Sequence, residues 1–420
     1  MTELDRELPE GYKMTELGPL PRAWEVVKLG DVGKTIKGRK PQQLTEDLKE
    51  GSVPYLTAEY FRTRNVSKFV PKDVKNFVKV DKDDIVFIWD GSNAGDVFTG
   101  LSGALASTMI KIDPEGDINK KFLYYYLKTK FLLFNTKTTG STIPHVNRNL
   151  FYNLPVPLPP LPEQRKIAAV LSTVQEAKEK TEAVISAAKS LKKSMMSYLF
   201  TYGPVPLPDA ENIPQKETEI GMIPEEWEAV RLGDVADLVM GQSPPGSTYN
   251  EIGEGLPFLQ GKAEFGPLHP RHIKYTTKPI KTAPKNSVLL SVRAPVGDVN
   301  IADIDYCIGR GLTSVSLSEG NNLFLFYILS YLKDEIEKEG TGSTFKAITK
   351  AKLMNIKIPL PPLPTQQKIA SMLSAIDEKI EAEENKKKAL EDLFNTLLHN
   401  LMTARIRVNH LALDKAELAM

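Results

Sequence analysis

The sequence predicts an α/β (α+β) fold in which two similar globular domains are joined by two long helices forming an antiparallel coiled coil. Three observations support this prediction. A proline-rich segment that opens a long helical pattern occurs twice, most of the chain is repeated once, and each half alternates short strand-like runs with a compact helix. We therefore expect a pseudo-twofold internal repeat.

The same proline-rich motif precedes both of the predicted long helices. P-L-P-P-L-P occupies 157–162 and returns at 359–364, and Gln, Lys, Ile and Ala follow each copy at matching positions. Successive prolines favour an extended approach, and Pro162 or Pro364 suits a first helical turn, where no N–H is needed. The chain therefore behaves as two halves organised around two long helices, expected over 163–200 and 365–403.

Apolar or small residues recur in both helices at alternating steps of three and four, which is the seven-residue repeat of a coiled coil. Thr181 interrupts the first row, and the second row has a polar middle at Lys379, Glu383 and Lys386. The predicted coiled-coil residues are Ile167, Val170, Val174, Val184, Leu191, Met195, Ile369, Met372, Ile376, Leu390, Leu393 and Leu397.

The helices also have complementary charges. Residues 163–200 carry seven Lys/Arg and four Glu, whereas 365–403 carry five Lys and seven Asp/Glu. About 38 residues at 1.5 Å each give a helix of about 57 Å, too long to be buried in one small domain. Two separate solvated helices remain an alternative. Pairing is preferred, and because a domain separates the helices, the antiparallel arrangement is the simplest.

The duplication extends over most of the chain. T-E-[IL]-G occurs at 15–18 and 218–221, L-G-D-V at 29–32 and 232–235, and G-S-T at 140–142 and 342–344. The offset is 203 and then 202 residues, so this is a tandem repeat of a domain plus helix rather than a solenoid. The expected segments are a domain at 1–160, a helix at 161–200, a linker at 201–217, a domain at 218–362, a helix at 363–403 and a tail at 404–420.

Within each half, β-branched and aromatic runs predict strands, and a compact helix follows them at 119–134 or 321–338. Phe122, Tyr125 and Tyr126 have helical spacing and are assigned to the core. The predicted strands are 53–56, 84–89, 107–112, 256–259, 287–292 and 312–317.

Composition indicates a cytoplasmic protein. Hydrophobic residues make up 41% and charged residues 25% of the 420 residues, and no apolar run has the length of a membrane span. The N-terminus has no signal-peptide core. The single cysteine, Cys307, cannot form an internal disulfide and is expected to be a small buried hydrophobe.

The halves differ most in two basic stretches. Residues 34–82 hold twelve Lys/Arg against six Asp/Glu, and 262–293 hold seven against Glu264 alone, although the whole chain has a net charge of only +1. Local positive charge favours phosphate contacts, and Arg, Lys, Asn, Gln and Thr on loops can contact base edges. Solvation of an ordinary surface is the alternative. The candidate DNA-binding residues are Lys34, Lys37, Arg39, Lys40, Gln42, Gln43, Thr57, Tyr60, Arg62, Arg64, Ser92, Asn93, Gln242, Ser243, Gln260, Lys262, Arg271, Lys274 and Arg293.

No catalytic centre is predicted. The sequence has no G-x-x-x-x-G-K-[ST] loop, no G-x-G-x-x-G, no H-E-x-x-H, no Asn-Pro-Pro-aromatic tetrad and no G-x-S-x-G. The five histidines lack ligand spacing, so no metal site is expected. The acidic residues at 81–84 are expected to end a strand rather than form a nuclease site, and Asp90 and Asp96 have no partnered base visible in sequence.

The doubled motifs resemble the specificity subunit of type I restriction–modification systems. The resemblance covers nearly the whole chain in the right order, and the proline-rich helix opening is its most specific part. It implies that each half is a target recognition domain for one part of a bipartite DNA site. It also implies docking of two methyltransferase subunits, which use S-adenosylmethionine, and possible association with ATP- and Mg-dependent restriction subunits. This chain would then bind no cofactor itself.

Under this resemblance the helix pair would set the spacer between two different half-sites. Two other functions stay open: a two-headed scaffold without a nucleic-acid role, and a fused methyltransferase or nuclease with unrecognised motifs.

Overall fold

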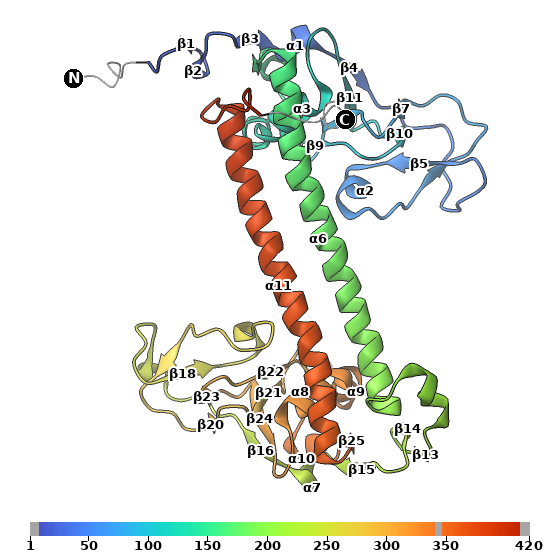
Figure 1. Cartoon of the computed structure of the whole chain (residues 1–420), viewed down its shortest axis with the longest axis vertical. Helices are drawn as coiled ribbons and strands as arrows, with labels where there is room; N and C mark the ends of the chain where they lie inside the picture. Colours follow the sequence, from blue (N-terminus) through green and yellow to red (C-terminus); the bar gives the residue numbers. More distant parts are fainter. Residues whose placement is uncertain (1–7, 141, 341–346, 412–420) are drawn as a thin grey trace. The chain divides into compact units, whose positions relative to one another are not determined.

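The computed structural model describes residues 8–140, 142–340 and 347–411, and Figure 1 shows its helices and strands. The chain forms two compact units. Unit 1 runs through residue 181 and includes the chain from residue 386 onward, whereas unit 2 comprises residues 182–385. Each long helix therefore contributes one part to each unit. Within the described ranges, no helix combines the length and apolar character needed to span a bilayer. Ser141 and the second G-S-T motif lie outside these ranges.

Unit 1 contains two four-stranded sheets, with strand orders β4-β11-β8-β9 and β6-β5-β10-β7. All four side chains of β8 are buried, which explains its unbroken apolar sequence I-V-F-I. The strands are β1 (Tyr12–Thr15), β2 (Gly18–Pro21), β3 (Glu25–Lys28), β4 (Gly33–Lys37), β5 (Val53–Leu56), β6 (Phe69–Val70), β7 (Lys79–Val80), β8 (Ile85–Ile88), β9 (Val97–Phe98), β10 (Gly103–Leu105), β11 (Met109–Pro114) and β12 (Pro155–Leu158). Its short helices are α1 (Leu29–Val32), α2 (Ala58–Thr63), α3 (Lys120–Lys128), α4 (Phe131–Thr136) and α5 (Arg148–Tyr152).

Unit 2 repeats this architecture with sheets ordered β16-β24-β21-β22 and β17-β19-β18-β23-β20. Its strands are β13 (Gln215–Thr218), β14 (Gly221–Pro224), β15 (Glu228–Arg231), β16 (Ala236–Met240), β17 (Tyr249–Asn250), β18 (Leu256–Leu259), β19 (Tyr275–Thr276), β20 (Thr282–Ala283), β21 (Val288–Ser291), β22 (Val299–Ile301), β23 (Tyr306–Ile308), β24 (Leu312–Leu317) and β25 (Lys357–Leu360). Its helices are α7 (Leu232–Val235), α8 (Asn322–Tyr331), α9 (Lys333–Glu339) and α10 (Lys350–Met354), with 3₁₀ turns at Leu207–Asn212, Gly246–Thr248 and Lys262–Glu264. The α/β prediction and the internal repeat are confirmed.

Each proline-rich segment begins as the end of a strand and finishes in the first turn of a long helix. β12 pairs antiparallel with β3, so Pro157 faces Val26, and β25 pairs with β15 in the same way. Each is a two-stranded sheet, in which a proline can occupy an edge without removing a needed hydrogen bond. The strand delivers the chain to the long helix, and in unit 1 the Gln164 amide then donates to the Pro159 carbonyl oxygen at 2.8 Å.

The compact helix predicted in each half is in fact two helices. In unit 1 the chain leaves the helical conformation at Lys130, between α3 and α4, and in unit 2 it does so at Leu332, between α8 and α9. The break lets the second helix turn Phe134 or Ile336 into the core, where both are fully buried. Phe122, Tyr125 and Tyr126 are buried on α3, as predicted.

The long helices are α6 (Leu161–Tyr202) and α11 (Leu363–Met402), shown in green and red in Figure 1. Their buried and half-buried positions follow a seven-residue repeat, but every second position is displaced by one residue from the predicted row. Val184, Leu191 and Leu393, predicted to be coiled-coil residues, are instead 41, 52 and 45% exposed. The row contains Ile167, Leu171, Val174, Lys178, Thr181, Ile185, Ala188, Lys192, Met195 and Leu199 in α6, and Gln366, Ile369, Leu373, Ile376, Ile380, Glu383, Lys387, Leu390, Phe394, Leu397 and Leu401 in α11.

The displacement has a simple physical reason. Ile185, Lys192 and Phe394 directly follow the three exposed residues, and steps of three and four can begin in either order. The observed row also contains the half-buried Lys178, Lys192 and Lys387, whose aliphatic stems can cover apolar surface while the ammonium groups reach solvent. Val170 and Met372 lie beside it, half-buried against the cores of their units.

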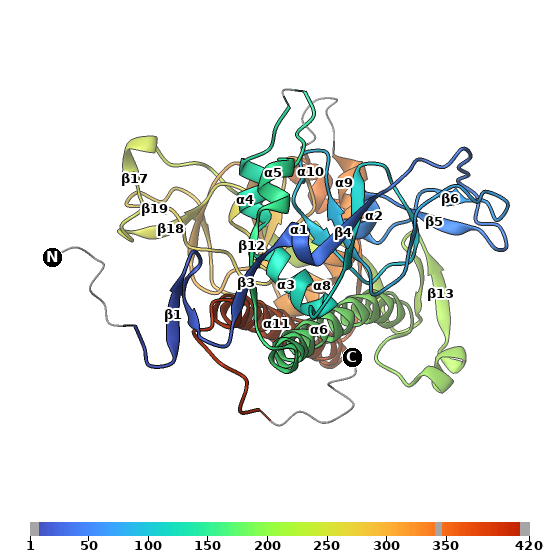
Figure 2. The same ribbon diagram turned by 90° about the horizontal axis from the view of Figure 1, so that it is seen from above.

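Each unit pairs its parts of α6 and α11 in antiparallel fashion, and both views show these helices side by side (Figures 1 and 2). In unit 2, Lys189 bonds to Glu384 and Lys192 to Asp377, with Nζ–O distances of 2.8 and 2.6 Å. Moving along α6 from Lys189 to Lys192, the partner on α11 moves back from Glu384 to Asp377, so the two helices run in opposite directions. In unit 1, Lys178 Nζ is 3.5 Å from Glu391 Oε1. The predicted antiparallel pairing is confirmed.

Candidate nucleic-acid interface

In unit 1, the short helix α2 brings four candidates together. Thr57 caps its N-terminus by accepting from the Tyr60 backbone N–H, Arg62 lies in its last turn, and Arg64 ends it with φ of 61°. Such a left-handed conformation is uncommon for a non-glycine residue. Thr57 therefore has a structural role, whereas both arginine side chains are exposed to solvent on one element.

The remaining candidates of unit 1 lie in β4 (Lys34 and Lys37), on the loop after it, or in the turn after β8. Lys34 is paired with Glu115, and Arg39 donates to Asn76 at 3.5 Å, so these two cations are partly engaged within the protein. Lys37 Nζ is 3.4 Å from Asp90. Lys40, Gln42, Gln43, Ser92 and Asn93 lie on loops, where Lys40 is exposed and the others are exposed or half-buried.

Asp90 has a partner that the sequence does not reveal. His145 Nδ1 is 2.6 Å from Asp90 Oδ1, and the backbones of the two residues form an antiparallel bridge. The residues are 55 positions apart, and no spacing rule joins them. The sequence shows no partnered base for Asp90, because the pair forms only when the loop carrying His145 folds back onto the turn after β8.

In unit 2, four candidates line one surface cavity of about 510 Å³: Ser243, Gln260, Lys262 and Arg293. Arg310, which was not among the candidates, lines the same cavity. It lies outside the basic stretch 262–293, and the only sequence signal for it is its position between two glycines, in G-R-G. Gln242, Arg271 and Lys274 are not part of the cavity lining. Arg271 Nη2 donates to the Ala263 carbonyl oxygen at 3.0 Å, and residues 260–264 line the cavity. Arg271 is therefore bonded to the backbone of a lining segment.

Lys262 is held in place by an acidic residue. Asp298 accepts from Lys262 and from Lys333, each with an N–O distance of 2.6 Å. Burial alone raises the pKa of Asp298, but the hydrogen bonds from the two ammonium groups outweigh it and keep that pKa below its ordinary value. The carboxylate therefore stays charged and holds Lys262 at the rim.

Comparison with known proteins identifies the family. The family model described as the type I restriction modification DNA specificity domain matches residues 21–187 and 224–392. The MjaX and MjaVIII type I restriction enzyme specificity subunits of Methanocaldococcus jannaschii, as these proteins are named, are 38 and 35% identical. The alignments cover 95 and 96% of this chain and 97% of each relative. The chain belongs to the family of type I restriction enzyme specificity subunits.

Solved structures agree with this family assignment. A chain from a study of complex assembly and conformational transition of the type I R-M system is 30% identical, with a TM-score of 0.55. The match covers 91% of this chain and 98% of that one. The type I restriction-modification S subunit of M. genitalium has a TM-score of 0.65 at 18% identity over 90 and 96% of the two chains, which supports the fold. The chain is thus a specificity subunit with two DNA specificity domains.

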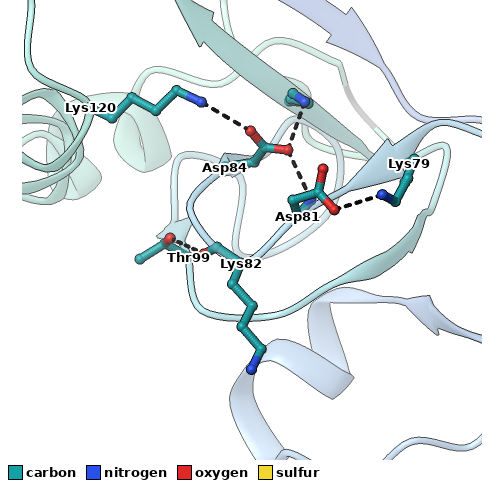
Figure 3. A network of polar contacts seen from close by, with 7 residues as sticks. Lys79, Asp81, Lys82, Asp84, Thr99 and Lys120 are labelled. Carbon is teal, nitrogen blue, oxygen red and sulfur yellow. Dashed lines mark hydrogen bonds and ion pairs between the residues drawn. The ribbon is translucent and has the colours of Figure 1, made fainter. Parts of the chain in front are cut away.

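Two of the acidic residues of this specificity subunit at 81–84 are paired with lysines, Asp81 with Lys79 and Asp84 with Lys111 and Lys120, as Figure 3 shows. Asp84 is buried and accepts from the Asp81 backbone N–H at 2.9 Å, and its oxygens lie 2.6 Å from Lys111 Nζ and 3.3 Å from Lys120 Nζ. Burial alone would raise the pKa of Asp84. The hydrogen bond from the Asp81 N–H and the two lysines together outweigh burial, so the pKa of Asp84 lies below its ordinary value. Asp84 precedes β8 and joins it to α3, which is a structural role.

Two further predictions concern a metal site and the single cysteine. Among the described residues, no group of three or more His, Cys, Asp or Glu side chains has the arrangement of a metal site. Cys307 is fully buried on β23, and burial raises the pKa of its thiol. Its prediction as a buried hydrophobe is confirmed.

The two specificity domains share a backbone frame, defined here by matching hydrogen bonds at an offset of 203 residues. Different side chains project from this frame at equivalent positions: Thr57 corresponds to Gln260, Asp90 to Arg293 and Ser107 to Arg310. The matching bonds are Gly38 N to Met109 O and Gly241 N to Leu312 O, Trp89 N to Thr108 O and Val292 N to Gly311 O, and Ala106 N to Leu56 O and Gly309 N to Leu259 O, all of 2.7–3.0 Å.

Proposed function

We propose that this chain reads a bipartite, asymmetric DNA site for a type I restriction–modification complex, each domain contacting one half-site. The observation that carries the proposal is the shared frame with different polar side chains at equivalent positions. The matching hydrogen bonds of the shared frame would place equivalent side chains in a similar relation to their own half-sites, so different side chains would select different bases. The DNA-facing residues are drawn from the candidates on α2, on the loops after β4 and β8, and around the cavity of unit 2.

The lengths of α6 and α11 set the spacer in this proposal. Helices of 42 and 40 residues are about 60 Å long at 1.5 Å per residue. DNA rises 3.4 Å per base pair along each strand, so this length corresponds to at most roughly 18 base pairs. The paired helices resist bending better than a single helix would, and a fixed spacer requires such stiffness.

The chemistry is assigned to partners. Two methyltransferase subunits with S-adenosylmethionine would modify the DNA, and restriction subunits with ATP and Mg would cleave it, whereas this chain binds no cofactor. Support for such partners comes from the match to type I restriction enzyme specificity subunits over nearly the whole chain. Since the substrate is DNA, we place the complex in the cytoplasm.

The test is co-expression with a methyltransferase subunit in a host that lacks adenine methylation at bipartite sites, followed by methylome sequencing. We expect one motif with two unlike halves and a constant spacer. Methyl transfer by the purified chain alone would instead favour a fused enzyme. A complex without salt-sensitive DNA retention would favour a scaffold, because phosphate contacts weaken steeply with salt.

A further inference from the structure

The cavity of unit 2 is lined by an exposed arginine, Arg310, that was not among the candidates predicted from the sequence. Arg310 lies between Gly309 and Gly311, in the segment that leads from β23 into β24. Its neighbours in the lining are Ser243 and Gln260, and Arg293 comes from the segment after β21. Four separate stretches of chain, one of which carries Arg310, thus line the cavity.

A close backbone contact requires glycine at position 311, and Gly309 is also tightly enclosed. A Cβ on Gly311 would lie 2.4 Å from the Gln260 carbonyl oxygen, and one on Gly309 would lie 3.1 Å from Gln260 Cα. The Gly309 N–H donates to the Leu259 carbonyl oxygen at 2.7 Å, and the Gly311 N–H donates to that of Gln260 at 3.2 Å. The backbone on either side of Arg310 is therefore fixed, so the side chain starts from a preorganised base.

The charges around the cavity leave the guanidiniums available. Lys262 is paired with Asp298, and a Glu264 carboxylate oxygen accepts from the Gly261 backbone N–H at 3.2 Å. Among the described residues, neither Arg310 nor Arg293 has a carboxylate within ion-pair distance. A planar guanidinium of this kind forms two parallel hydrogen bonds with O6 and N7 of guanine in the major groove, which is the commonest specific arginine–base contact.

The first domain lacks this feature at the equivalent place. Ser107 corresponds to Arg310 in the shared frame, and Asp90, which corresponds to Arg293, is bonded to His145. A serine hydroxyl cannot form the two parallel bonds. The difference is thus confined to side chains on a common backbone.

We propose that Arg310 reads a guanine in the half-site bound by unit 2, and that the first domain makes no such contact at the equivalent position. This inference rests on the proposed function, since it specifies a base within the bipartite site. Loss of the contact should reduce discrimination at that one base pair by about 5- to 150-fold.

The first experiment compares the methylomes of hosts that express the methyltransferase with the wild-type chain, Arg310→Ala or Lys338→Ala. Lys338 is an exposed lysine on α9, outside the cavity, so its loss controls for the removal of one positive charge. We expect a guanine in the second half-site of the wild-type and Lys338→Ala motifs, and relaxation of that position alone in Arg310→Ala. A bipartite motif without a guanine in that half would overturn the inference and leave the proposed function standing. Absence of any bipartite motif would overturn both.

The second experiment uses the wild-type complex and so does not depend on the folding of a variant. Each guanine of the second half-site is replaced in turn by 7-deazaguanine, which lacks the N7 acceptor, and affinity is measured at constant salt. One replacement should weaken binding, but by less than the roughly 5- to 150-fold loss of the whole bidentate pair, because O6 remains as an acceptor. Unchanged affinity at every guanine would overturn the inference. So would an Arg310→Ala complex that loses affinity equally for all sequences, because that result indicates a phosphate contact.

Discussion

Arg407 forms a bidentate ion pair with Glu163, 244 residues earlier in the chain, with Nε–Oε1 and Nη2–Oε2 distances of 2.6 and 2.9 Å. Glu163 also accepts from Trp24 Nε1 at 3.0 Å, and its side chain is only 6% exposed. The hydrogen bond to Glu163 raises the pKa of Arg407. This ion pair therefore joins the segment after α11, which carries Arg407, to the first turn of α6 within unit 1.

Arg407→Ala should destabilise unit 1 by about 2–4 kcal/mol, because it leaves a buried carboxylate without its cation. Thermal denaturation and hydrogen exchange of the backbone amides of 404–411 would measure the effect. Arg405→Ala is the matched control, since Arg405 is an exposed arginine on the same segment. Equal protection of these amides in both variants would contradict the fastening role.

Asp84→Asn should destabilise unit 1 by about 1–3 kcal/mol at pH 7, because it replaces the carboxylate that pairs with Lys111 and Lys120 by a neutral amide with a single acceptor oxygen. The pKa of Asp84 is lowered in the folded state, so its stabilisation is complete above the ordinary value of 3.8 and is lost as the pH falls through the folded pKa. Urea denaturation at pH 7 and pH 3 should therefore show a smaller difference between wild type and variant at pH 3. A difference independent of pH would contradict the charge-based explanation.

Ile185→Ala should cost about 2–4 kcal/mol, whereas Val184→Ala should change stability by no more than about 0.5 kcal/mol. The two residues are adjacent on α6, but only Ile185 is buried. Chemical denaturation of the isolated chain measures both values without partner subunits. The reverse order of costs would show that the row predicted from sequence is the correct one.

Arg62→Ala and Arg293→Ala should each weaken DNA binding by the assembled complex. If either residue contacts a phosphate, its loss should also reduce the slope of log affinity against log salt by about 0.9. Titrations between low and moderate salt would measure both quantities, with Lys338→Ala as the control. Unchanged affinity in both variants would discredit the assignment of these segments to the interface.

Removing seven residues from the middle of each long helix, 182–188 and 382–388, should shorten the recognised spacer by about three base pairs. Seven residues correspond to about 10 Å of helix, and each base pair to 3.4 Å. Methylome sequencing would report the new spacer. The same deletion in one helix alone is the control, because unequal helices cannot preserve the pairing. Retention of the original spacer would exclude the measuring role.

The sequence predicted the repeat, the two long helices and their antiparallel pairing, because these depend on long periodic patterns. It misplaced alternate coiled-coil positions, since Val184 and Ile185 are both apolar and periodicity alone does not choose between them. It missed Arg310 and the pairing of His145 with Asp90 for another reason. Both depend on which loops converge after folding, and no local pattern encodes a contact between residues 55 positions apart.

The shared backbone frame has a consequence for how such proteins change over time. Its defining hydrogen bonds join main-chain N–H and C=O groups, so they place no demand on the identity of Ser107 or Arg310. Under the proposal that Arg310 contacts a base, substitutions at these positions would alter which base is preferred while these main-chain bonds stay intact. Base preference could then evolve in one half of the molecule at a time without a new fold.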